Sequence, residues 1–115
     1  GQLLQNLGYM LHQLGDHEAA RVRLEAARDV IEGALGADNP AVAPAYTVLG
    51  DVARAQGRWA DARAAYQRSH AIRVAVHGPV HPSLLLPLTG LGEVALAEGD
   101  ADAAVRTLEQ ALACI

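Results

Sequence analysis

Two histidines stand at a spacing that metal sites on helices use. His77 and His81 are four residues apart, which would place both imidazoles on one face of a helix. Gly78 and Pro79 lie between them, however, and these two residues interrupt helices. His81 also directly precedes a proline, as Asn39 does, at a point where a helix should begin. The sequence therefore favours a capping role for His81, and we expect no metal.

The other reactive residue types are not grouped in a catalytic pattern. Ser69 and Ser83 have no base or oxyanion loop near them in the sequence. The chain contains no lysine and so no phosphate-binding loop of the G-x-x-x-x-G-K type. Cys114 is the single cysteine, which excludes an internal disulfide, and it is most simply a small core residue. We expect no catalysis and no cofactor.

The charge balance limits the class of partner. Nine basic residues, all of them arginine, face thirteen acidic residues, so the formal net charge is −4. An acidic chain without a basic cluster argues against nucleic acid and against an anionic membrane surface. The longest apolar run, from Leu84 to Leu88, is far too short to cross a bilayer. The chain opens without a secretory signal, and we expect a cytoplasmic protein.

The elements that would position any site repeat at a fixed interval of 42 residues. Self-similarity at such a period is typical of a solenoid, in which one supersecondary unit stacks on copies of itself. A protein of this kind works by offering a long surface. Three sets of residues recur at this interval: Leu7-Gly8, Leu49-Gly50 and Leu91-Gly92; Gly15, Gly57 and Gly99; Ala20, Ala62 and Ala104.

The middle unit predicts an antiparallel pair of helices. A first helix should begin at Asn39-Pro40, run to about Gln56, and end before Gly57. A second should span about Trp59 to His77. The spacing of apolar and small residues predicts the buried faces: Val42, Ala45, Tyr46, Leu49, Val52 and Ala53 on the first helix; Trp59, Ala62, Ala65, Tyr66, Ser69, Ile72 and Val76 on the second.

Small residues and prolines refine this picture. Gly50, Ala62 and Ser69 should mark the close approach of the two helices, and the other units hold small residues at the same places. Pro87 falls inside the helix that Pro82 starts, so it should delete a backbone hydrogen bond and bend the helix, and Pro44 should do so less severely. Tolerance near a helix start and a kink that widens a groove are both open interpretations. The counterparts of the small residues are Gly8, Ala20 and Ala27; Gly92, Ala104 and Ala111.

The chain resembles the tetratricopeptide repeat family. Residues 7–20 carry the pattern Leu-Gly…Gly-Asp-His-Glu-Ala-Ala, and the other two units repeat it in register over essentially the whole chain. The corners from Leu35 to Pro40 and from His77 to Pro82 resemble those of kinesin light chains, and residues 87–93 look like repeats attached to bacterial Ser/Thr kinases. The resemblance implies an all-α, right-handed superhelical solenoid of three helix-turn-helix units, approximately 1–38, 39–80 and 81–115. The uncapped ends predict a fragment of a longer array.

In this family the first helix of each pair lines a concave groove that binds a peptide or partner helix. The resemblance therefore implies a protein–protein interaction module without catalysis. Asn6 matches the family's backbone-pairing asparagine, whereas Val48 and Gly90 replace it in the other units. The lysine and asparagine set of chaperone-tail receptors is absent, so that partner is not expected. The implied groove residues are Gln2, Gln5, Asn6, Tyr9, His12, Gln13, Thr47, Asp51, Arg54, Thr89, Glu93 and Leu96.

Two alternatives remain open from the sequence. The chain would instead be a structural or assembly module if its uncapped ends self-associate or position another domain of a larger signalling protein. A weakly basic stripe on the outer face of the middle second helix would meet an acidic partner, or it is simply the solvated side of that helix. The stripe consists of Arg63, Gln67, His70, Arg73 and His77.

Overall fold

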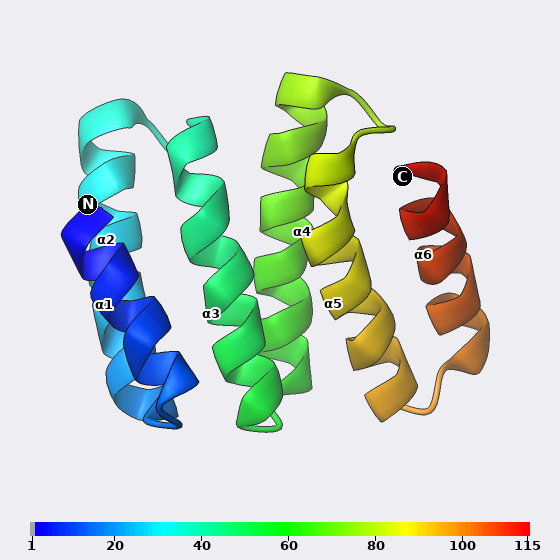
Figure 1. Cartoon of the computed structure of the whole chain (residues 1–115), viewed down its shortest axis with the longest axis horizontal. Helices are drawn as coiled ribbons and strands as arrows, with labels where there is room; N and C mark the ends of the chain where they lie inside the picture. The colour runs from blue at the N-terminus through cyan, green and yellow to red at the C-terminus, as the bar shows by residue number, and fades with distance from the viewer. Residues whose placement is uncertain (1) are drawn as a thin grey trace.

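The computed structural model describes residues 2–115, with side chains described from Gln5 onward. Within this range the chain forms six α-helices in three antiparallel pairs that follow one another along the long axis of the molecule, with the two ends on opposite sides (Figure 1). The predicted all-α repeat architecture is confirmed. The helices are α1 (Gln2–Gln13), α2 (His17–Leu35), α3 (Ala43–Ala55), α4 (Trp59–His77), α5 (Leu85–Ala97) and α6 (Ala101–Ala113).

A glycine in the left-handed conformation ends the first helix of each pair. Gly57 has φ +74°, a value that residues with a Cβ rarely adopt, and the Arg58 N–H then donates to the Ala53 carbonyl at 2.9 Å. Gly15 and Gly99 repeat this turn, with φ of +85° and +80°. Because the same turn closes all three pairs, the two helices of each pair run antiparallel with a similar offset.

The predicted caps before the prolines are confirmed. The Asn39 side chain accepts a hydrogen bond from the Ala41 N–H at 2.9 Å, and His81 Nδ1 accepts one from the Ser83 N–H at 3.0 Å. The His77 and His81 rings stack in parallel, with their centroids 4.0 Å apart. Both histidines therefore have a structural role at the corner between α4 and α5.

Pro44 and Pro87 stand near the starts of their helices and do not interrupt them. Each first helix of the second and third units is preceded by a short 3-10 helix, Pro40–Val42 or Pro82–Leu84, and the α-helix begins only after it. Pro44 and Pro87 thus lie in the first turn of α3 and α5, where a proline is tolerated. This position agrees with the first of the two interpretations, tolerance near a helix start.

The buried faces are largely those predicted, with one exception on α4. Val42, Leu49 and Val52 are buried, as are Ala62 and Ile72.

Val76 is about half-exposed, so its predicted burial was wrong. Val74 packs instead against the cluster around Leu84 and Leu88. Residues i and i+2 of a helix point in directions about 200° apart, so Val74 and Val76 cannot both face α5.

Tyr66 is the largest fully buried side chain in the described residues, and two glycines make room for it. A Cβ added to Gly50 would lie 2.7 Å from the ring, and one added to Gly90 would lie 2.4 Å from it. Gly8 and Gly92 likewise face Leu24 and Leu108, the counterparts of Tyr66. The predicted close approach at Gly8, Gly50 and Gly92 is confirmed. Tyr66 alone also requires a glycine on the next unit.

Replacement of Gly90 by alanine should therefore destabilise the fold. Gly90→Ala forces the methyl group into the Tyr66 ring, and overpacking of this kind costs about 1–3 kcal/mol. Urea unfolding followed by circular dichroism measures the change. Gly33→Ala in α2 is the matched control, because it meets no atom within 4 Å and should stabilise the protein by about 0.5–1 kcal/mol.

A smaller side chain at position 66 should relieve the clash. In a Tyr66→Leu background, the additional change Gly90→Ala should cost much less than it does in the wild type. An equal cost in both backgrounds would contradict the assigned contact.

Candidate partner-binding site

Three charged residues from two different units meet on the side of the first helices. Arg54 on α3 forms an ion pair with Glu93 on α5, and its Nη2 lies 3.6 Å from Asp51 Oδ1. These contacts are possible because α3 packs against both α1 and α5. The structure thus brings together Asp51, Arg54 and Glu93, which the resemblance placed in a groove.

The hydroxyl of the buried Tyr66 joins this cluster from below. Tyr66 donates a hydrogen bond to Asp51, and Arg54 Nε donates one to the Tyr66 hydroxyl oxygen at 3.2 Å. Burial raises the pKa of Tyr66, and the neighbouring Asp51 carboxylate raises it further. The hydroxyl therefore stays protonated at neutral pH and holds Asp51 in place as a donor.

His12 on α1 lies beside the same cluster. Burial lowers the pKa of His12, Asp51 opposes this effect, and His17 and Arg54 lower the pKa further. Its Nδ1 is 3.3 Å from His17 Nδ1. Charges from α3 thus act on a residue of α1, the first helix that packs against α3.

The remaining predicted residues divide into exposed and buried ones. The exposed set lies on α1 and α5. It comprises Asn6, Tyr9, Gln13, Thr89 and Leu96.

Gln5 and Thr47 are buried instead, and the side chain of Gln2 lies outside the described residues. Thr47 Oγ1 is 2.6 Å from Ser69 Oγ and accepts a hydrogen bond from Arg73 Nη2 at 3.3 Å. Its predicted place on a binding surface is therefore not available to a partner. We call the accessible set without the apolar Leu96 the first-helix face: Asn6, Tyr9, His12, Gln13, Asp51, Arg54, Thr89 and Glu93.

The basic stripe expected on the outer side of α4 is not continuous. Arg63 is paired with Glu98 of the next unit. Arg73 turns inward, where it donates to Ser69 Oγ at 3.0 Å and to the Ser83 carbonyl at 3.4 Å. That carbonyl stands four residues before Pro87, whose missing N–H would otherwise be its helical partner. Burial lowers the pKa of Arg73, consistent with this inward position.

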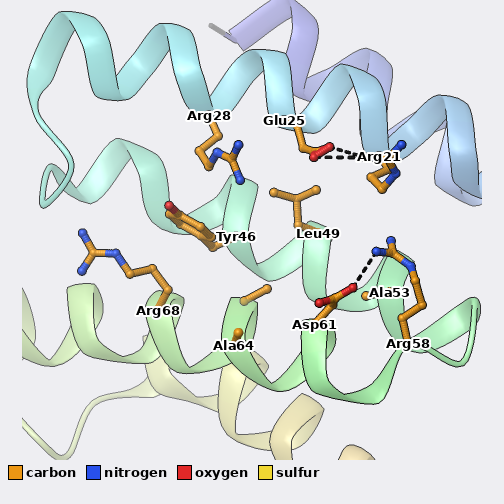
Figure 2. Close-up of a pocket in the computed structure, with 11 residues that line it drawn as sticks. Arg21, Glu25, Arg28, Tyr46, Leu49, Ala53, Arg58, Asp61, Ala64 and Arg68 are labelled. Atoms are coloured by element: carbon orange, nitrogen blue, oxygen red, sulfur yellow. Dashed lines mark hydrogen bonds and ion pairs between the residues drawn. The ribbon is translucent and has the colours of Figure 1, made fainter.

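A pocket that the sequence did not indicate lies between α2 and α4, with α3 as its floor (Figure 2). Its volume is about 460 Å³. Four of the nine arginines of the chain line it, which is the signal that sequence reasoning missed. We call it the arginine pocket: Arg21, Glu25, Arg28, Tyr46, Leu49, Ala53, Arg58, Asp61, Ala64, Ala65 and Arg68.

The two ends of the arginine pocket differ in their charges. At one end Arg28 and Arg68 flank the Tyr46 ring, with their guanidinium carbons 5.9 and 6.0 Å from its centroid. At the other end, Arg21 pairs with Glu25 and Arg58 pairs with Asp61 (Figure 2). Only the second end thus supplies carboxylates from the pocket wall itself.

The described residues contain neither a cluster of metal-binding side chains nor a membrane-spanning helix. No group of three or more histidine, cysteine or acidic side chains is placed there to hold a metal ion. No helix of the described range is both long and apolar enough to cross a bilayer.

Comparison with known proteins identifies the class of this chain. A sequence profile of the tetratricopeptide repeat matches residues 2–73 and again residues 45–114. The chain therefore belongs to the tetratricopeptide repeat family. Repeats of this family generally act as scaffolds for protein–protein interaction. No curated protein matches the chain.

The hydrogen bond between Tyr66 and the charged cluster should contribute measurably to the free energy of unfolding. Tyr66→Phe removes the hydroxyl that donates to Asp51, and loss of a hydrogen bond to a charged group should cost about 1.5–3 kcal/mol. Urea unfolding measures the cost. Tyr9→Phe is the control, because half of the Tyr9 side chain is exposed, and it should change stability by less than about 0.5 kcal/mol. Equal effects of the two variants would contradict the linkage.

Proposed function

We propose that the first-helix face binds a peptide or a partner helix. The observation that supports this proposal is the convergence of Asp51, Arg54 and Glu93, which come from two units of the chain, with His12 of the first unit on the helix that packs against α3. Exposed polar side chains of α1 and α5 extend the surface on both sides of this cluster. A ligand that lies across the first helices would contact all three units at once.

A charged group of a ligand could replace one member of an ion pair in the charged cluster. The side chains of Arg54 and Glu93 are 36% and 46% exposed, and ion pairs of such exposure contribute at most about 1 kcal/mol. A carboxylate or an ammonium group of a ligand can therefore replace one member at little cost. Asp51 stays in position because Tyr66 holds it, so the site is partly preorganised.

Selected ligands test this function. Peptides are selected on the immobilised chain from a random library, and their affinities are measured by titration calorimetry. Arg54→Ala should weaken binding about tenfold or more, because it removes a central contact of the face. Asn6→Ala should also weaken it. Arg23→Ala, an exposed arginine on α2, should leave it unchanged.

Helical content, measured by circular dichroism, must be the same in all variants. Ligands that bind equally well to the wild type and to Arg54→Ala, Asn6→Ala and Glu93→Ala would refute the proposal.

A second candidate function is assembly through the two end faces. Met10 on α1 is 59% exposed, whereas its counterparts Val52 and Val94 are 0% and 1% exposed because a preceding second helix covers them. Leu108 on α6 is 38% exposed, whereas its counterparts Leu24 and Tyr66 are fully buried. Each end thus presents an apolar face. In the interior, the equivalent faces pack together at two interfaces, between α2 and α3 and between α4 and α5.

The residues at the two ends also complement each other. Between α4 and α5, Arg63 forms an ion pair with Glu98. The corresponding positions at the ends are Val105 on α6 and Leu14 directly after α1, and both are exposed. If α6 of one copy packs on α1 of another, two apolar side chains meet where the interface between α4 and α5 has opposite charges. We propose that copies of this chain associate head to tail in this register.

Solution mass across a wide range of concentrations tests the assembly. Light scattering after gel filtration should show a mass that rises with concentration for the wild type. Val105→Arg or Leu14→Glu alone should lower association by burying an unpaired charge. The double variant recreates the interior ion pair and should associate more strongly than either single variant.

Val76→Arg, on an exposed position of α4, serves as the control and should not change the mass. A strictly monomeric wild type would rule out self-association and leave the first-helix face as the functional surface.

A further inference from the structure

We propose that the arginine pocket is a second ligand site, and that it binds an acidic peptide segment which carries an apolar side chain. The pocket is separate from the first-helix face, because its walls come from α2 and α4 and only its floor comes from α3. This site does not depend on the function proposed for the first-helix face.

The middle of the pocket suits an apolar group. Leu49 and Ala53 form its floor, and Ala64 and Ala65 line the wall on α4 (Figure 2). These side chains offer no strong hydrogen-bonding group to a ligand. A volume of about 460 Å³ lies within the range of ligand pockets and accommodates one large side chain with part of its backbone.

The end around Tyr46 suits a carboxylate. Arg28 and Arg68 flank the aromatic ring there, and both guanidinium groups offer several donors in a fixed plane. An acidic group beside this end is Glu32, whose carboxylate accepts a hydrogen bond from the Tyr46 hydroxyl at 2.6 Å and does not line the pocket. The two acidic residues that line the pocket belong to its other end. Of the charged groups that line the pocket at the Tyr46 end, an entering carboxylate would therefore meet Arg28 and Arg68.

The acidic groups that now neutralise these arginines are easily replaced. Arg28 is paired with Asp29 and Arg68 with Asp38, and neither aspartate lines the pocket. The Asp29 and Asp38 side chains are 66% and 91% exposed, so both ion pairs are largely solvated. Such pairs contribute little, and a ligand that is already held by its apolar group can displace them.

The surroundings favour a peptide with a few carboxylates over a polyanion. Glu18, Glu25 and Asp61 all lie near the other end of the pocket, paired with Arg21 and Arg58. A nucleic acid would place phosphates against these carboxylates as well as against the arginines. A peptide can instead place one acidic side chain near Tyr46 and an apolar one over Leu49.

Titration of the isotope-labelled full chain with a short peptide of leucine and glutamate tests the site by NMR. Saturable shifts should appear at the amides of Arg28, Tyr46 and Arg68. The same peptide with glutamine in place of glutamate should bind about tenfold more weakly. Added salt should lower the affinity of the glutamate peptide.

Variants separate the two parts of the pocket. Arg28→Gln and Arg68→Gln should each reduce affinity for the acidic peptide several-fold, whereas Arg23→Gln on the same helix as Arg28 should not. Ala64→Trp fills the apolar middle and should abolish binding of both peptides. Circular dichroism confirms that each variant is folded.

Three results would overturn the inference: absence of saturable shifts at the pocket, equal binding of the glutamate and glutamine peptides, or displacement of the peptide by a short single-stranded DNA. Shifts confined to α1 and α5 would also refute this site, while they would support binding at the first-helix face. Failure at the pocket and failure at the first-helix face are thus distinguishable.

Discussion

The ring of Tyr66 between Gly50 and Gly90 is the contact on which the rest of this structure depends. It fills the space between α3, α4 and α5, and neither glycine position tolerates a Cβ without a shift of the ring. Its hydroxyl also reaches the surface cluster and holds Asp51 and Arg54. One side chain therefore sets both the spacing of two units and the geometry of the charged group above them.

This contact also explains why the three units are not equivalent. Leu24, Tyr66 and Leu108 occupy the same place in successive units, and each faces a glycine of its own first helix. Tyr66 is the largest of them and is covered by helices on both sides, whereas Leu108 remains partly exposed. Gly90 stands where the other units have Asn6 and Val48, and the ring leaves no room for a side chain there.

Helix α3 presents different side chains on two of its sides. Asp51 and Arg54 point toward the cluster with Glu93, while Tyr46, Leu49 and Ala53 form the floor of the arginine pocket. Helix α3 contacts both α1 and α5, and the pocket lies between α2 and α4. Because one helix supports both surfaces, a ligand on either side would contact the same rigid element. A scaffold of three units can thus present two chemically distinct sites.

Local signals in the sequence determined the helices. The 42-residue period, the glycines that end the first helices and the Asn39 and His81 caps each depend on a few neighbouring residues, so they could be interpreted without a structure. The span of α4 was predicted correctly for the same reason. The start of α3 and α5 was not, because whether a turn near a proline is 3-10 or α-helical depends on its packing against the preceding helix.

Only the tertiary structure decided which side chains meet. Arg54 and Glu93 are 39 residues apart, and nothing local to either one indicates the other. Thr47 is buried against Ser69 across the helix pair, and the arginine pocket depends on how far apart α2 and α4 lie. Such contacts arise from the distance and rotation between helices, which side-chain packing sets. The sequence by itself determined the repeated unit, and packing determined the surfaces that the units form together.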